Sequence, residues 1–143
     1  MVFQGEFDHS VDDKGRVIIP TRFRSQLGER FYLTKGLNHC IFIYTDMEFK
    51  SMSEKLGIQR PLDENTLRLQ RFFTSTESSV DSQGRVAIPI KLRKHAGISE
   101  CGEVVIVGTG NRIEIWDSDR WNSYNDELTD DLIAGAAREV GLA

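Results

Sequence analysis

Residues 11–20 have the sequence VDDKGRVIIP, and residues 80–89 have the sequence VDSQGRVAIP. Seven of these ten positions are identical, and the aligned residue numbers differ by 69, as in Asp12 and Asp81. The similarity runs on through Arg24 and Arg93, and it resumes after a three-residue insertion. A repeat of this length indicates that one structural unit has been duplicated within the chain.

Each copy predicts the same order of elements: two strands, a short helix, two more strands and a longer helix. Runs rich in Val, Ile, Tyr and Phe indicate strands at 4–9, 16–19, 31–34 and 40–44, and again at 76–80, 85–88, 103–107 and 112–116. Pro20 and Pro89 suit the start of a short helix, and Gly28 and Gly97 suit its end. Longer helices are expected at 46–56, 63–73, 117–128 and 130–139.

One copy alone is too short to bury an adequate core, so the two copies are expected to fold together. The predicted fold class is α+β, with a closed or nearly closed β-barrel of pseudo-two-fold symmetry and helices outside it. We expect one module at 5–57, a linking helix at 58–75, a second module at 76–119 and a C-terminal helical extension at 120–143.

The composition fits a soluble globular protein, with 143 residues, 39% of them hydrophobic and 28% charged. No apolar run suggests a membrane span or a signal peptide, so we expect a cytoplasmic protein without membrane contact. Cys40 and Cys101 are far apart in the sequence, and we expect them to be buried or half-buried free thiols.

The net charge of −4 disfavours a nucleic-acid binder when it is averaged over the chain, but the charges are segregated. Residues 11–28 and 80–97 carry an excess of positive charge, whereas the acidic residues dominate from Glu114 onward. Such segregation fits a basic recognition face. The residues predicted to form it are Lys14, Arg16, Arg22, Arg24, Arg85, Lys91 and Arg93.

The repeated Asp-x-x-x-Arg spacing pairs Asp12 with Arg16 and Asp81 with Arg85. A carboxylate at this position can hold a guanidinium by charge-assisted hydrogen bonds and orient its remaining donors outward. A salt bridge that only stabilises the turn explains the same spacing, and both interpretations stay open on the sequence.

The doubled D-x-K/Q-G-R-V-x-I-P motif, each copy followed by x-x-x-R, resembles the MraZ family of bacterial transcriptional regulators, which are built from two SpoVT-AbrB-type swapped-hairpin modules. The resemblance implies sequence-specific binding to repeated boxes in the protein's own promoter, upstream of the division and cell wall gene cluster. It also implies a ring-shaped homo-oligomer associated with the nucleoid. Asp12 and Asp81 would orient Arg16 and Arg85. Gln83 replaces Lys14 in the second copy, so the two turns are expected to bind DNA unequally.

Parts of the sequence are compatible with other functions. A single match of this type would also suggest an AbrB-type antitoxin or a sporulation regulator, and a structural ring or interaction module would need no DNA. An aspartic hydrolase could pair Asp12 with Asp81, but the neighbouring arginines oppose a shared proton. Asp and His side chains can bind divalent cations, and four of them cluster near the N-terminus: Asp8, His9, Asp12 and Asp13. No such cluster recurs near Asp81, which disfavours a metal site. We therefore expect no catalytic residue, no metal and no cofactor.

The aromatic side chains are expected to serve packing. Most of them fall on predicted helices or on alternating strands and are not interleaved with basic residues. Their expected place is the core or a subunit interface. The residues concerned are Phe72, Phe73, Trp116, Trp121 and Tyr124.

Overall fold

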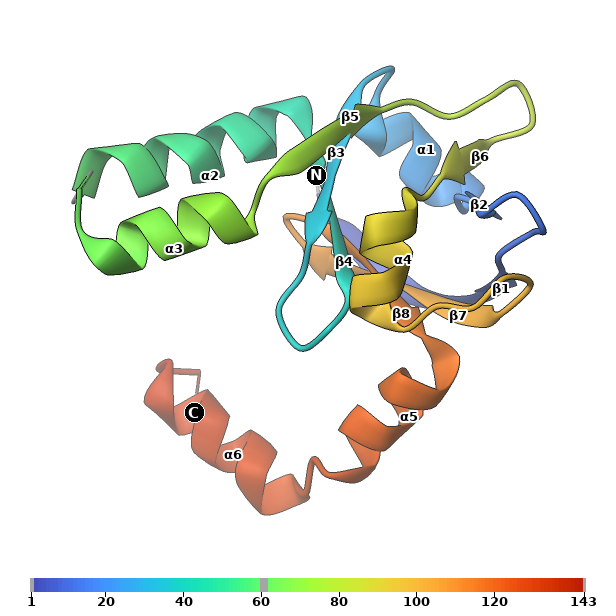
Figure 1. The fold of residues 1–143 in the computed structure, drawn as a ribbon. Helices are drawn as coiled ribbons and strands as arrows, with labels where there is room; N and C mark the ends of the chain where they lie inside the picture. Colours follow the sequence, from blue (N-terminus) through green and yellow to red (C-terminus); the bar gives the residue numbers. More distant parts are fainter. Residues whose placement is uncertain (1, 60–61, 143) are drawn as a thin grey trace.

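A computed structural model describes residues 2–59 and 62–142 of the chain. Residues 60 and 61 of the expected linking segment, and residue 143 of the expected extension, lie outside the described residues. The protein is a mixed α+β structure (Figure 1). The strands are β1 (Phe3–Ser10), β2 (Arg16–Ile18), β3 (Phe31–Lys35), β4 (Ile41–Thr45), β5 (Ser75–Ser78), β6 (Arg85–Ala87), β7 (Glu103–Gly110) and β8 (Ile113–Asp117). The helices are α1 (Thr21–Leu27), α2 (Asp46–Gln59), α3 (Glu64–Phe72), α4 (Ile90–Ala96), α5 (Ser118–Asp126) and α6 (Asp130–Glu139).

The strands of the two repeats interleave in space. The larger sheet has the order β1-β7-β8-β4-β3-β5, and β2 pairs with β6 in a separate two-stranded ribbon. Equivalent residues meet at the centres of both symmetric pairs, Phe42 opposite Glu114 and Val17 opposite Val86. The predicted pseudo-two-fold relationship is therefore found, with its axis between β4 and β8 and between β2 and β6.

The closed barrel is not found. The six-stranded sheet ends at β1 and β5, and no ladder joins these two edges among the described residues. Each edge strand instead turns into a strand of the β2–β6 ribbon. The inward side chains Val17 and Val86 of this ribbon belong to the same buried cluster as Ile43 and Ile115 of the sheet. Side-chain packing, and not a continuous hydrogen-bonded ladder, encloses the core.

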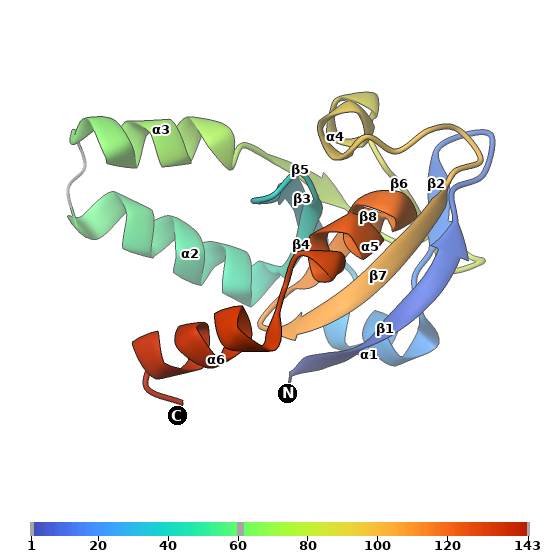
Figure 2. The same ribbon diagram turned by 90° about the horizontal axis from the view of Figure 1, so that it is seen from below.

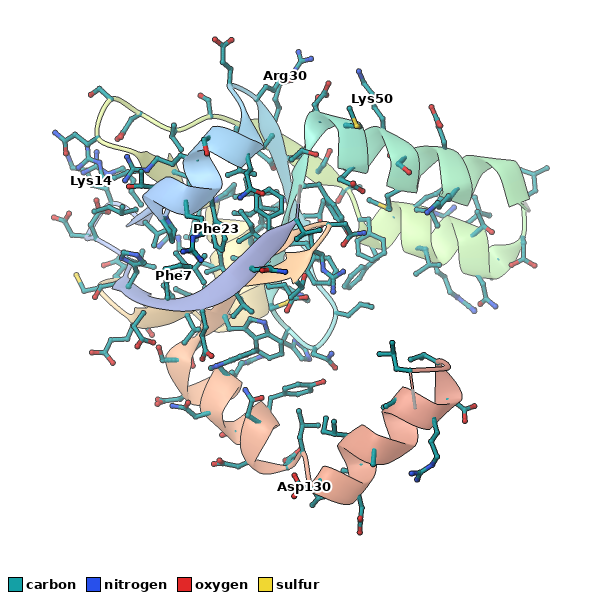
Figure 3. The ribbon with its side chains drawn as sticks, turned by 180° about the vertical axis from the view of Figure 1, so that it is seen from behind. Phe7, Lys14, Phe23, Arg30, Lys50 and Asp130 are labelled. Carbon is teal, nitrogen blue, oxygen red and sulfur yellow. The ribbon has the colours of Figure 1, made fainter. Side chains whose placement is uncertain are left out.

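The short helices follow their proline and glycine signals. Pro20 and Pro89 are the N-cap residues of α1 and α4, and Gly28 and Gly97 are the C-cap residues, both with positive φ. Phe23 of α1 is fully buried and contacts Phe7 of β1 edge to face, with ring centroids 5.3 Å apart (Figure 3). This packing fixes α1 against the edge strand and so fixes the turn between β1 and β2.

The remaining helices extend away from the core. Helices α2 and α3 form a hairpin at the end of the molecule opposite the β2–β6 ribbon, and α5 leads to an outlying α6 (Figures 1 and 2). Helix α6 buries no residue, and its Leu132 and Ile133 are 57% and 52% exposed. None of the helices in the described parts of the chain is long and apolar enough to cross a membrane.

A second apolar cluster covers the outer face of the sheet. Cys40, Phe42, Tyr44 and Trp116 are buried there, and Phe73 and Trp121 pack against them. The Cys40 thiol has a raised pKa because it is desolvated by burial. Cys101 is exposed, in a turn with φ of 57°, so the expectation that both thiols are at least half-buried was wrong for this residue. The polar turn that follows α4 keeps it at the surface.

Candidate nucleic-acid interface

The first motif turn is organised by the carboxylate of Asp12. Its Oδ1 accepts hydrogen bonds from the backbone N–H groups of Lys14 and Arg16, both at 2.9 Å. Its Oδ2 accepts a hydrogen bond from Nε of Arg16 at 2.8 Å. The turn closes with a backbone hydrogen bond from Gly15 to Asp12, and Gly15 has a φ of 75°, which favours glycine. One carboxylate thus fixes both the backbone and the arginine.

The second turn repeats this geometry atom for atom. Asp81 Oδ1 accepts from the N–H groups of Gln83 and Arg85 at 2.9 Å, and its Oδ2 accepts from Nε of Arg85 at 2.8 Å. Gly84 has a φ of 78°. Replacing Lys14 by Gln83 changes no bond within the turn, because only the backbone N–H of this residue contacts the aspartate.

Both aspartates are stabilised as anions. The backbone N–H of Arg16 lowers the pKa of Asp12, and its guanidinium lowers this pKa further. The backbone and the guanidinium of Arg85 lower the pKa of Asp81 in the same way. A hydrolytic pair of carboxylates needs one of them to hold a proton, which requires a raised pKa. The geometry therefore opposes the hydrolase alternative.

The β2–β6 ribbon brings the two motifs together. Arg16 faces Ala87 and Arg85 faces Ile18 in the antiparallel register. Because alternate residues of a strand point to the same side, the two arginines share the outer side of the ribbon while Val17 and Val86 point into the core. In the described part of the chain, the terminal amino groups of both arginines donate no hydrogen bond and remain available for a ligand.

Two further arginines hold each repeat against the other. Nε of Arg24 donates to the carbonyl of Ile19 at 2.7 Å, and Nε of Arg93 donates to the carbonyl of Ile88 at 3.1 Å. The Arg24 guanidinium rests on Gly84 of the opposite repeat, and that of Arg93 rests on Gly15. The sequence did not indicate this exchange between the repeats, because it depends on tertiary structure.

The other predicted basic residues are more exposed. Lys14 stands at the outer tip of the first turn, at the end of the molecule away from the α2–α3 hairpin (Figure 3). Arg22 and Lys91 are exposed on α1 and α4. We use the name basic face for the five residues that the turns and the ribbon gather. These are Lys14, Arg16, Arg24, Arg85 and Arg93.

A hollow of about 400 Å³ opens on the basic face. Arg16 and Arg85 line it together with Ala87 and with two carboxylates, those of Glu77 and Asp81. Ser78 and Ser79 also line it, and no sequence pattern had marked these two residues. Hydroxyl groups beside two guanidinium groups provide donors for an anion such as a phosphate.

No group of three or more His, Cys, Asp or Glu side chains arranged to hold a metal occurs among residues 2–59 and 62–142. Asp12 is occupied by its own turn and by Arg16. Its oxygens therefore already have partners, and this does not favour a metal site with Asp8, His9 and Asp13, the cluster that the sequence already disfavoured.

The chain is similar to known proteins over almost its whole length. A family model described as "MraZ protein, putative antitoxin-like" matches twice, at residues 2–73 and 71–142. Transcriptional regulator MraZ of Alkaliphilus metalliredigens is 47% identical over 99% of this chain and 100% of its own. The proteins of the same name from Halothermothrix orenii and Limosilactobacillus fermentum are 43% and 40% identical, with at least 99% of each chain covered.

Among solved structures, the solution structure of PHS018 from Pyrococcus horikoshii matches 82% of this chain and 97% of that chain. The TM-score is 0.35 and the sequence identity is 18%, so this likeness carries no weight for the fold or the site.

Proposed function

Since the chain belongs to the MraZ family, we propose that it is a transcriptional regulator, not an enzyme, and that it binds double-stranded DNA through its basic face. The DNA would carry repeated boxes in the protein's own promoter, upstream of the division and cell wall gene cluster. The full-length relatives bear the name of a transcriptional regulator, which favours this function over an antitoxin or a purely structural ring.

The single observation that carries the proposal is the placement of Arg16 and Arg85 side by side on one exposed ribbon. Asp12 and Asp81 occupy Nε of each arginine, which leaves the two terminal amino groups directed outward. A guanidinium fixed in this way loses little conformational entropy when it binds, and it can donate two hydrogen bonds to a guanine or to a phosphate. The same salt bridge would therefore stabilise the turn and orient the guanidinium toward DNA.

The other basic residues suit contacts with the DNA backbone. Lys14, Arg22 and Lys91 are exposed, so their charges are accessible to phosphates. Arg24 and Arg93 have Nε bound to a main-chain carbonyl, and we assign their remaining donors to phosphates beside the ribbon. The five cations of the basic face, concentrated in a net-acidic protein, would orient this face toward DNA.

We further infer that the two repeats are fused swapped-hairpin modules of the SpoVT-AbrB type. The interleaved strand order supports this assignment. Strand β1 of the first repeat pairs within the half of the sheet formed by the second repeat, and β5 of the second repeat pairs within the half formed by the first. The module boundaries that we propose remain 5–57 and 76–119, with the linking helix at 58–75 and the helical extension at 120–143.

We propose that the chain assembles into a ring-shaped homo-oligomer and that binding to DNA places it at the nucleoid. The exposed apolar side chains of α3 and α6 are the proposed subunit contacts, and Leu69, Leu132 and Ile133 are between 40% and 57% exposed. Head-to-tail contacts that close produce a ring. Several linked copies would strengthen binding to correctly spaced boxes by about 10² to 10⁴.

Footprinting on the DNA upstream of the protein's own gene tests the proposal. We expect protection of regularly spaced boxes, with protection lost together at all boxes when Arg16 and Arg85 are both changed to alanine. A Glu64→Gln variant on α3, far from the basic face, is the control and should protect like the wild type. Absence of protection by the wild-type protein would contradict the proposal.

A further inference from the structure

The outer side of the β2–β6 ribbon carries one side chain whose chemistry does not suit a phosphate. Four residues project from this side, Arg16 and Ile18 from β2 and Arg85 and Ala87 from β6. Ile18 is 43% exposed, although the residues on either side of it, Val17 and Ile19, are fully buried. The ribbon therefore exposes an isoleucine directly opposite Arg85 and two residues from Arg16.

This isoleucine breaks the symmetry of the ribbon. Arg16 and Arg85 occupy equivalent positions of the two repeats, as do Val17 and Val86 on the axis. The position equivalent to Ile18 is Ala87, which is also exposed and which lines the hollow of about 400 Å³. One half of the ribbon thus presents a β-branched apolar side chain where the other half presents a methyl group beside open space.

A two-stranded antiparallel ribbon fits the major groove of B-DNA. In that groove guanine offers two acceptors to an arginine, and thymine offers its 5-methyl group, which is the apolar feature of the base edges. An isoleucine between two arginines directed at guanines would be close to the base edges and distant from phosphates. Its natural contact there is a thymine methyl group.

We propose that Ile18 contacts the 5-methyl group of a thymine, and that the ribbon consequently recognises a non-palindromic box with a thymine requirement on the Ile18 side only. This inference rests on the proposed DNA-binding function and specifies the chemistry of its site. The pseudo-two-fold protein would thereby gain a fixed direction on the DNA.

Deoxyuridine provides the most direct test, because it differs from thymidine only by the missing methyl group. Each thymine of one box in the promoter duplex is replaced in turn, and the affinity is measured by competition. One replacement should weaken the wild-type protein about fourfold, the effect of one buried methyl group. The same replacement should leave the affinity of Ile18→Ala unchanged, whereas Ile90→Ala, at an exposed position outside the ribbon, should respond like the wild type.

A swapped variant makes the test reciprocal. The double change Ile18→Ala with Ala87→Ile exchanges the two exposed positions, and the hollow beside residue 87 has room for the larger side chain. The duplex for this test has thymine at both mirror-related positions of the box. The position at which deoxyuridine weakens binding should move to the other side of the box. The mass of each variant in solution is compared with that of the wild type, so that a change in assembly is not mistaken for a change in recognition.

Two different failures are distinguishable. If the wild-type protein does not prefer the promoter duplex over scrambled DNA, the proposed function fails. If it does prefer the promoter but no thymine shows a methyl effect that depends on Ile18, or if the swap does not move that effect, the inference about Ile18 is overturned while the function stands.

Discussion

The guanidinium of Arg93, from the second repeat, rests against Gly15 in the motif turn of the first repeat. A β-carbon placed on Gly15 would lie 2.8 Å from Cζ of Arg93, closer than real contacts allow. The backbone carbonyl of Gly15 also accepts a hydrogen bond from Ile88 at 2.9 Å. Arg24 and Gly84 repeat the relationship in the opposite direction. Each motif turn is therefore shaped by its own aspartate and supported by the other repeat.

Gly15→Ala should lower the free energy of unfolding by more than a change at a comparable glycine without this contact. A non-glycine residue with positive φ costs about 1–2 kcal/mol, and Arg93 must also move. Gly110→Ala is the control, since Gly110 has a φ of 87° and an added β-carbon would meet nothing within 4 Å. Urea unfolding of both variants, and of Gly15→Ala combined with Arg93→Ala, measures the two contributions. If all three variants lose the same free energy of unfolding, the close contact between Gly15 and Arg93 does not contribute to stability.

Acid should destabilise the protein partly through the motif turns. Asp12 and Asp81 have folded pKa values below the ordinary 3.8, because backbone N–H groups and an arginine favour the anion. The stabilisation is complete above that value and is lost as the pH falls through the lower folded pKa. The variant Asp12→Asn with Asp81→Asn should lose less stability than the wild type between neutral pH and pH values below 3.8. Identical acid dependence in urea unfolding would contradict the assignment, and Asp13→Asn controls for the charge.

The assembly should depend on helix α6. Ile133→Asp places a carboxylate on an apolar side chain that is 52% exposed in the single chain, so the fold should persist while the subunit contact is lost. Ala134→Asp adds the same charge to a neighbouring exposed position and should leave the assembly intact. Light scattering measures the mass of the assembly, and circular dichroism checks that the fold persists. Equal mass for the wild type and for Ile133→Asp would argue against α6 as the contact.

The sequence predicted the fold where local signals were strong. Helix α6 runs from Asp130 to Glu139 as expected, and the capping residues of α1 and α4 were identified correctly. The repeat itself predicted the pseudo-two-fold relationship between the two halves of the fold. The expected closure of the barrel was not found among the described residues. Closure depends on hydrogen bonds between two sheet edges that are distant in sequence, and the repeat carries no information about those bonds.

The residue types of the candidate site and the contacts within each motif turn were predictable, whereas the contacts between the two repeats were not. The Asp-x-x-x-Arg spacing identified both salt bridges, which form inside a single turn. The packing of Arg24 and Arg93 on glycines of the opposite repeat depends on tertiary structure, so their spacing gave no sign of it. The outward position of Ile18 follows from alternation between buried Val17 and Ile19, which the sequence could have shown.

The central claim is that Arg16 and Arg85 recognise promoter DNA, and a salt series of binding measurements tests it most directly. Anisotropy of a promoter duplex and of a scrambled duplex is followed from about 50 to 300 mM salt, where phosphate contacts weaken steeply. The wild type should prefer the promoter at every concentration, and each of Arg16→Ala and Arg85→Ala should cost about 1–3 kcal/mol and relax that preference. Equal affinity for both duplexes, or a double variant that keeps the wild-type preference while folded, would contradict the account.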